Sequence, residues 1–246
     1  MTKVVASIEA RMGSTRLPGK VLMEIEGQPA LQRLITRLKK CRCLDGIVLA
    51  TSTASADDEL ANWAKSLGLS CYRGSEDDVL QRVVYAHQMM NSDVIVEVTG
   101  DCPLLDSEII DLGIETFLAN DCDVVTNARY PSYPQGADVQ VFRADALAYV
   151  ASNIDDPAVR EHVSLYFYEN PSLYRIIHLI APLAQRAPNI RLQLDYAEDL
   201  AFIREVYRQL EFKYGACFGL TEILTLLRKS PEIALINADC KEKLIR

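Results

Sequence analysis

The 246-residue sequence has no apolar run long enough to cross a membrane, since none reaches about eighteen consecutive apolar residues. Its first residues also lack the apolar core of a secretory signal peptide. Positive charge is in deficit, because 26 Lys and Arg face 34 Asp and Glu and leave a net charge of −8. An acidic surface repels nucleic acid phosphates and anionic lipid headgroups. We therefore expect a cytoplasmic protein with no nucleic acid and no membrane among its partners.

Cysteine and histidine are also too few, or too poorly spaced, to suggest a metal centre or a disulfide framework. The seven cysteines are an odd number, and Cys41-Arg42-Cys43 has no matching Cys or His pair for a zinc site. Cys102 is a candidate nucleophile because it follows Asp101, but no histidine is close to it in the sequence. We disfavour that role and interpret most cysteines as small, reduced, buried side chains.

Apolar segments of strand length alternate with amphipathic helical segments over the first half of the chain. The pattern predicts helices at residues 29–40, 56–67, 77–90 and 106–118, and strands at residues 4–8, 47–51, 69–72, 94–98 and 124–126. Strands separated by helices indicate right-handed βαβ units. The predicted fold class is therefore α/β, with a mainly parallel sheet.

The alternation breaks after residue 126. Residues 127–136 are rich in turn formers and predict a loop, which is followed by strands at 137–142, 174–180 and 190–194 and helices at 143–152, 156–169, 196–210 and 221–229. The sequence has no internal repeat and no low-complexity tract. We predict a single domain, residues 1–246, in which residues 127–190 form an excursion over the sheet.

The segment EARMGSTRLPGK, from Glu9 to Lys20, concentrates three cations in this acidic chain: Arg11, Arg16 and Lys20. Its glycines allow backbone N–H groups to approach a phosphate closely, and its cations can pair with phosphate oxygens. It is neither a Walker A sequence nor a G-x-G-x-x-G motif. The structural alternative is a solvated surface turn. In either case we expect Lys20 to be exposed and to contribute little to folding stability.

Three more polar segments follow predicted strands, at residues 73–78 and 100–103 and at Asp195. Ligands of open α/β sheets bind beyond the carboxyl ends of the strands, so these segments and the cationic loop are expected to form one site. Asp101 and Asp195 would repel each other there, which predicts a divalent cation between them. In the structural alternative, Asp195 caps the following helix and Asp101 braces its own turn.

Together these motifs resemble those of the cytidylyltransferases that activate 2-keto sugar acids, the CMP-Kdo and CMP-sialic acid synthetases. The resemblance is closest to their SpsF-type relatives, named for spore coat polysaccharide synthesis. Most of the chain is covered, in order, by RMGSTRLPGK (11–20), RGSEDDVLQR (73–82), TGDCPL (99–104), GADVQVF (136–142), REHV (160–163) and LDYAEDL (194–200). Two positions depart from the SpsF pattern: Gln140, where a glutamate is expected, and Tyr196-Ala197, where Thr-Pro or Tyr-Pro is commoner.

The resemblance implies a Rossmann-like, three-layer nucleotide-diphospho-sugar transferase fold, with an excursion that binds the sugar and forms a homodimer. It implies transfer of CMP from CTP to a 2-keto-3-deoxy sugar acid, with release of pyrophosphate, for surface polysaccharide synthesis. The implied cofactor is Mg²⁺, held by Asp101 and Asp195. The implied catalytic residues are Lys20, Arg11 and Asp101, with the two cations on the triphosphate.

The resemblance also places the nucleotide on the cationic loop and on the second motif, RGSEDDVLQR at residues 73–82. The implied nucleotide contacts are Ala10, Arg11, Met12, Gly13, Ser14, Arg16, Lys20, Arg73, Asp78, Arg82 and Gly100. Backbone amides from Met12 to Ser14 are expected to help bind the phosphates. For Asp78 and Arg82 a structural role can coexist, as a helix-start carboxylate and its i,i+4 ion-pair partner.

The acceptor is expected in the second half of the chain, because binding residues concentrate in irregular loops. The candidates are Arg129, Tyr130, Gln135, Gly136, Asp138, Glu161 and His162. His162 is either a sugar contact or proton acceptor, or a buried histidine that donates to a carbonyl. We interpret His87 and His178 as structural.

Two other functions are weighed against cytidylyl transfer. A GT-A-type glycosyltransferase binds a nucleotide-sugar through a D-x-D motif, and Asp121-Cys122-Asp123 has that form. It precedes Val124-Val125, however, and so is predicted at the amino end of a strand, the wrong edge of the sheet. A non-catalytic nucleotide-binding module on the same scaffold is disfavoured by the paired carboxylates beside a cationic loop.

Overall fold

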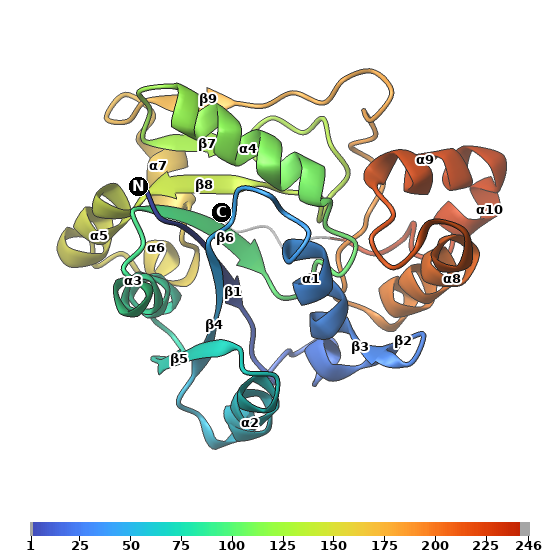
Figure 1. Cartoon of the computed structure of the whole chain (residues 1–246), viewed down its shortest axis with the longest axis horizontal. Helices are drawn as coiled ribbons and strands as arrows, with labels where there is room; N and C mark the ends of the chain where they lie inside the picture. The colour runs from blue at the N-terminus through green and yellow to red at the C-terminus, as the bar shows by residue number, and fades with distance from the viewer. Residues whose placement is uncertain (1, 242–246) are drawn as a thin grey trace.

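The computed structural model describes residues 2–241, and its centre is a seven-stranded sheet in the order β5-β4-β1-β6-β8-β7-β9 (Figure 1). All strands run in the same direction except β8, which pairs antiparallel with both β6 and β7. The predicted α/β class with a mainly parallel sheet is confirmed. The strands are β1 (Val4–Glu9), β4 (Gly46–Ser52), β5 (Ser70–Gly74), β6 (Val94–Thr99), β7 (Val124–Thr126), β8 (Gln140–Arg143) and β9 (Ile176–His178).

Helices cover both faces of the sheet and give three layers. Strand residues alternate between the faces, so that Val4, Ala6 and Ile8 pack into one core and Val5 into another. The first core is shared with α1 (Ala30–Leu38), α2 (Asp58–Ser66), α4 (Ser107–Ala119), α8 (Ala197–Tyr214) and α9 (Leu220–Lys229). The opposite face carries α3 (Val79–Met90), α5 (Ala144–Asn153), α6 (Pro157–Glu161) and α7 (Leu165–Glu169).

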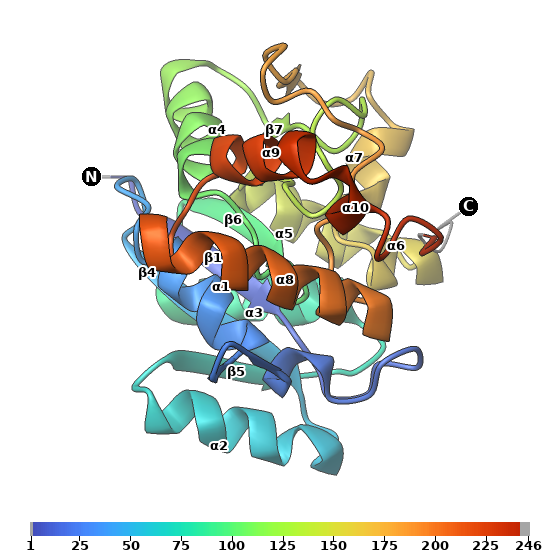
Figure 2. The same ribbon diagram turned by 90° about the vertical axis from the view of Figure 1, so that its right-hand side faces the viewer.

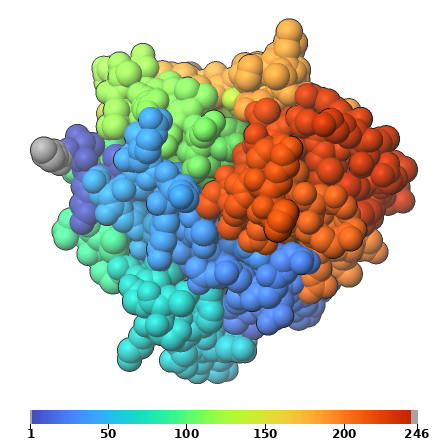
Figure 3. Space-filling view, turned by 45° about the vertical axis from the view of Figure 1, so that its right-hand side comes forward, coloured from blue at the N-terminus to red at the C-terminus, as the bar shows by residue number. Residues whose placement is uncertain are grey.

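The carboxyl-terminal helices lie against the amino-terminal segment rather than at the far end of the sheet. An antiparallel hairpin of β2 (Glu24–Ile25) and β3 (Gln28–Pro29) precedes α1, and Arg204 of α8 donates to the Glu24 carbonyl at 2.9 Å. Arg33 of α1 forms an ion pair with Glu211 of α8. Figure 2 shows α8 lying across α1, and in Figure 3 the blue segment that includes α1 adjoins the orange-red carboxyl-terminal helices on one surface. The short helix α10 (Pro231–Ala234) packs against α8 and α9.

Three predicted elements differ from the structure, all of them within or beside the excursion. Residues 190–194 are not a strand, because their only ladder contact is the isolated bridge between Gln135 and Arg191. The helix predicted at 156–169 is divided into α6 and α7, since the Leu165 N–H donates to the His162 carbonyl in a turn between them. The excursion also does more than cover the sheet: it contributes β8, which is inserted between β6 and β7, and the edge strand β9.

None of the helices within residues 2–241 is long and apolar enough to cross a membrane.

Candidate active site

Lys20 lies between the carboxylates of Asp101 and Asp195, which are far from it and from each other in the sequence. Its Nζ is 2.7 Å from Asp101 Oδ2 and 2.8 Å from Asp195 Oδ1. Lys20 begins the short 3₁₀ helix η1 (Lys20–Leu22), Asp101 follows β6, and Asp195 precedes α8. All three residues are buried. The structure thus brings the loop and the two carboxylates together at the carboxyl edge of the sheet.

Further cations surround Asp195. Arg16 of the loop lies 2.8 Å from Asp195 Oδ1, and Arg191 lies 2.6 Å from Asp195 Oδ2. Burial by itself would raise the pKa of Asp101, but the Lys20 ammonium outweighs it and lowers that pKa below its ordinary value. Burial would lower the pKa of Lys20, and the two carboxylates raise it instead. The site therefore holds the Asp101 carboxylate ionised and Lys20 charged.

This placement corrects the expectation for Lys20. The sequence predicted an exposed lysine of little consequence for stability, whereas the structure shows a buried lysine with two ionic partners. The error has a physical reason: both partners lie at least 81 positions away along the chain. Asp195 also does not cap α8, because Asp199 accepts the N–H groups of Asp195 and Tyr196, at 2.9 and 3.0 Å.

A carboxylate that the sequence motifs did not single out, Asp57, pins the cationic loop. Its Oδ1 accepts the Met12 N–H at 2.6 Å, and its other oxygen binds the Ser52 hydroxyl. The Ser14 N–H donates to the Met12 carbonyl at 2.9 Å. Two of the amides expected to bind phosphate are therefore engaged within the protein in this conformation. The only signal at Asp57 in the sequence is that it is an anion in the first turn of the helix predicted at 56–67.

Gly100 and Ala10 hold the ends of β6 and β1 together beneath the loop. The Gly100 N–H donates to the Glu9 carbonyl at 2.8 Å. A Cβ atom at Gly100 would lie 2.7 Å from the Cβ of Ala10, so only glycine allows this approach. These two predicted nucleotide contacts therefore also set the distance between the loop and Asp101.

The second motif is braced by its own polar contacts. Arg73 donates to the carbonyls of Ser52 and Ala54, at 2.8 and 3.0 Å, and pairs with Asp58. Arg82 donates to the carbonyls of Ser75 and Glu76 at the same turn. Arg11 reaches this segment through Glu76, with 3.3 Å between Nη1 and Oε1. The cationic loop thus contacts the second motif through Arg11 and the carboxylate site through Arg16 and Lys20.

Asp78 has the predicted helix-start role, but its ion-pair partner is different. It accepts the Gln81 N–H at 2.9 Å at the start of α3. The expected pair with Arg82 is wrong, because Asp78 Oδ2 lies 3.2 Å from Arg160 of α6. This contact places the end of α6, with the exposed Glu161 and the partly buried His162, beside the start of α3.

The excursion residues divide into two groups. Gln135 accepts from Arg191 at 3.3 Å and so supports the arginine that binds Asp195. Gly136 adjoins Gln193, whose side-chain amide donates to Asp101 at 3.3 Å. The Gly136 N–H donates to Asp138 at 3.2 Å. The second group, exposed Arg129 and Tyr130, lies near the start of the excursion, and the Tyr130 ring packs edge-on against His178 with 4.5 Å between ring centroids.

The structure speaks against two alternatives. Cys102 is buried and carries a pKa well above its ordinary value because of burial, so its thiol remains protonated and is a poor nucleophile. Asp121 and Asp123 lie before β7, at the edge of the sheet away from Lys20, where Arg175 pairs with both and Arg143 with Asp123. The D-x-D sequence is thus a structural ion-pair cluster.

The donor set at Asp101 and Asp195 suits Mg²⁺, which prefers carboxylate oxygens and needs only one or two from the protein when phosphates supply others. Within residues 2–241 no cluster of three or more acidic, histidine or cysteine side chains offers a self-sufficient metal cage. The convergence of the two carboxylates on one cationic group, the Lys20 ammonium, shows that the position favours positive charge. The residues present therefore fit the expected ion.

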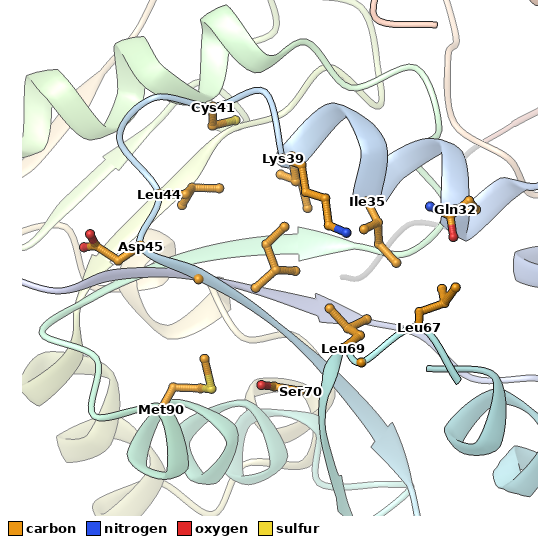
Figure 4. Close-up of a pocket in the computed structure, with 14 residues that line it drawn as sticks. Gln32, Ile35, Lys39, Cys41, Leu44, Asp45, Leu67, Leu69, Ser70 and Met90 are labelled. Carbon is orange, nitrogen blue, oxygen red and sulfur yellow. The ribbon is translucent and has the colours of Figure 1, made fainter. Parts of the chain in front are cut away.

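Figure 4 shows a hollow of about 440 Å³ that lies elsewhere on the molecule. It is bordered by α1, the start of β4 and the end of α3, at the amino edge of the sheet. Its lining combines apolar side chains such as Ile35, Leu69 and Met90 with polar ones such as Gln32 and Lys39. It shares no residue with the carboxylate site, and the chemistry described above does not use it.

Comparison with known proteins agrees with this geometry. The model of the cytidylyltransferase family matches residues 5–222. The chain belongs to this family. It is 34% identical over 242 residues to the spore coat polysaccharide biosynthesis protein SpsF of Bacillus subtilis, covering 95% of this chain and 98% of that protein. The resemblance that the motifs suggested is confirmed.

Solved structures extend the comparison. A cytidylyltransferase from Leptospira borgpetersenii serovar Hardjo-bovis superposes with a TM-score of 0.89 at 30% identity, over 99% of this chain and all of that one. A CMP:2-keto-3-deoxy-manno-octonic acid synthetase complexed with CTP gives a TM-score of 0.61 at 20% identity, over 85% of this chain and 99% of that one. The second match shows a common fold, which agrees with the predicted Rossmann-like nucleotidyltransferase architecture.

Proposed function

We propose that this cytidylyltransferase couples CTP to a 2-keto-3-deoxy sugar acid and releases pyrophosphate, in a route to a surface polysaccharide. The observation that carries the proposal is the Asp101–Lys20–Asp195 cluster at the carboxyl edge of the sheet. It lies between the cationic loop on one side and the excursion on the other. The name of the SpsF relative supports a polysaccharide precursor, and the CTP-bound structural relative supports the nucleotide.

The chain's own residues suit an in-line transfer. The acceptor hydroxyl attacks the α-phosphorus, the bond to the β-phosphate oxygen breaks, and the acceptor proton leaves to solvent or to a nearby carboxylate. Such a reaction needs charge neutralisation and positioning more than covalent chemistry. Arg11, Arg16 and Lys20 are the cations available to the triphosphate, and Asp57 fixes the loop that carries them.

Asp101 and Asp195 would hold Mg²⁺, which supplies neutralisation of phosphate charge when bound. Lys20 lies between these carboxylates in the present conformation, and it would pair with the phosphates of bound CTP. Asp138, Gln135 and Tyr130 are proposed as acceptor contacts from the excursion. A homodimer through residues 130–190 also stays a prediction, which sedimentation of the purified protein tests.

The deciding experiment is a pyrophosphate-release screen of the four nucleoside triphosphates against a panel of sugar acids, with and without Mg²⁺. We expect turnover with CTP and a 2-keto-3-deoxy sugar acid, and none with excess chelator. Asp101→Asn and Asp195→Asn should each remove that turnover, and the double variant should lose little more, since both residues serve one site. CTP binding without turnover on any acceptor would instead favour a nucleotide-binding module.

A further inference from the structure

A row of polar side chains crosses the sheet on the face covered by α3, α5 and α7. It consists of direct cross-strand neighbours from five adjacent strands: Ser7 opposite Glu97, Glu97 opposite Gln140, Gln140 opposite Thr126, and Thr126 opposite His178. Neighbouring positions on the same face are apolar and belong to the cores, as Ile95, Phe142 and Val124 show. A polar row through an otherwise apolar layer lowers stability unless its members are hydrogen-bonded.

The middle of this polar row is fully bonded. Gln140 donates its side-chain amide to Glu97 Oε2 at 2.8 Å and accepts the Tyr168 hydroxyl proton. The Tyr168 oxygen is also 2.7 Å from the Thr126 hydroxyl. Tyr168 thereby fixes which way the Gln140 amide points, and Gln140 fixes the Glu97 carboxylate. This is the position where the chain departs from the glutamate of the SpsF pattern.

The end of the polar row near the cationic loop is only partly satisfied, because Glu9 and Glu97 hydrogen-bond to each other while neighbouring polar atoms lack partners. Glu9, which pairs with Thr99, lies two positions beyond Ser7 along β1 and therefore on the same face of the sheet. Ser7 Oγ, Glu9 Oε1 and Arg82 Nε are buried and have no hydrogen-bond partner among the described residues. No ion pair within residues 2–241 includes Glu9 or Glu97.

The charges around this end favour a shared proton. Burial, reinforced by Glu97, raises the pKa of Glu9 well above its ordinary value, although Arg82 of α3 opposes this. Burial raises the pKa of Glu97 to about 7, and Asp138 adds to the rise. Among residues 2–241, Arg82 is the cation that acts on Glu9, and it donates from Nη1 to two backbone carbonyls. Two buried carboxylates thus lack a full counter-charge.

The polar row lies where the proposed acceptor would bind. Glu9 directly precedes Ala10 and Arg11 of the cationic loop, and Glu97 stands four residues before Asp101. At the other end, His178 packs against Tyr130 of the excursion. A purely structural pair of buried carboxylates would be less stable than apolar residues of the same size, so stability does not explain it.

We propose that Glu97 and Glu9 form a subsite for an amino group on the acceptor, so that the enzyme prefers an aminated sugar acid in its ammonium form over its hydroxyl counterpart. The inference rests on the proposed function. An ammonium has three donors, and Ser7 Oγ, Glu9 Oε1 and a Glu97 oxygen are the acceptors available to it. Its charge lets both carboxylates ionise, and the proton they share is released to solvent. A hydroxyl offers one donor and no charge.

The test uses three acceptors that differ at one carbon, which carries an amino, an acetamido or a hydroxyl group. In the wild-type enzyme kcat/KM for pyrophosphate release should be at least about tenfold higher with the amino acceptor, because a buried polar site rejects analogues that leave it unpaired. In Glu97→Gln the amino-to-hydroxyl ratio should fall toward one. Glu115→Gln, at an exposed glutamate of α4, is the matched control and should keep the wild-type ratio.

A calorimetric measurement separates the two proposals. Binding of the amino acceptor, measured in buffers of different ionisation enthalpy, should release protons in the wild-type enzyme and not in Glu97→Gln. If Glu97→Gln does not fold, Glu9→Gln is measured in its place. Turnover with equal kcat/KM for amino and hydroxyl acceptors overturns the amino subsite and leaves the proposed function standing. Absence of turnover with every acceptor overturns the proposed function, and the amino subsite then fails too unless Glu97-dependent proton release is seen.

Discussion

At the scale of single residues, the decisive feature is a lysine that satisfies two acids. Lys20 was recognisable from the sequence as a phosphate-binding candidate, but its burial between Asp101 and Asp195 was not. A buried cation shared by two carboxylates is strongly coupled to folding, because removing it leaves two charges without compensation. The same group therefore matters to stability and to chemistry.

Replacing Lys20 by methionine tests this coupling. Lys20→Met keeps the side-chain length and removes the charge, and we expect a loss of about 3 kcal/mol in the free energy of unfolding, as for a broken buried ion pair. Turnover should fall by roughly two to three decades. Urea unfolding and pyrophosphate release measure the two effects. The control, Lys65→Met, changes an exposed lysine in the last turn of α2 and should alter neither; an unchanged unfolding energy in Lys20→Met would contradict the buried pair.

At the scale of elements, the site depends on an irregular segment that no ladder stabilises. Residues 190–195 connect to the rest of the protein through the Gln135 bridge and through the Leu194 N–H, which donates to the Asp101 carbonyl at 2.8 Å. These contacts place Arg191, Gln193 and Asp195 around Lys20 and Asp101. Alternating apolar residues in this stretch predicted a strand, whereas pairing with two loops determines its actual conformation.

Gly136 is the position on which this segment depends most. It has φ of 84°, and a Cβ atom there would lie 2.8 Å from the Gln193 backbone nitrogen. Gly136→Ala should therefore displace the segment that carries Gln193 and Asp195, lowering both turnover and the melting temperature.

Gly215→Ala is the matched comparison for this variant. Gly215 has φ of 77° and ψ of 176°, a region that glycine almost alone populates, and a Cβ atom added there would meet no other atom within 4 Å, so only the backbone cost of about 1–3 kcal/mol applies. Gly136→Ala should cost at least about 1 kcal/mol more, because its contact adds overpacking. Equal melting temperatures of the two variants would show that the close approach does not matter.

At the scale of the whole molecule, stability should depend on pH through a histidine far from the site. His87 of α3 is buried and its Nδ1 lies 3.0 Å from the Ser92 hydroxyl, while its Nε2 has no partner among the described residues. Burial lowers the pKa of His87 to about 3 from an ordinary value near 6.5. Because the folded state holds the neutral form, unfolded chains bind the extra proton as the pH falls below about 6.5.

Stability contributed by neutral His87 is present above about pH 6.5 and is lost as the pH falls toward about 3. Between pH 6 and pH 4 this group should add roughly 1.4 kcal/mol of destabilisation per pH unit, which His87→Gln should remove while keeping the bond to Ser92. Urea unfolding of both proteins at several pH values measures the difference. Parallel stability curves would refute a neutral buried histidine.

The sequence by itself determined the α/β class, most strands of the parallel half and the family. These follow from local information: apolar periodicity, a cationic loop after the first strand and carboxylates after later strands. It also identified Lys20, Asp101 and Asp195 individually, because their chemical type and their places at strand ends are visible along the chain. The same reasoning correctly placed the D-x-D sequence at the opposite edge of the sheet.

Only the tertiary structure decided which partners these residues have. Lys20 meets its carboxylates across 81 and 175 positions, Arg191 shares Asp195 with Arg16, and Glu97 lies beside Gln140 because β8 is inserted next to β6. A carboxylate within the apolar run of β6 was the one local sign of the polar row. Strand order and loop pairing arise from packing of the whole chain, and a one-dimensional pattern carries no information about which distant charge will neutralise a given side chain.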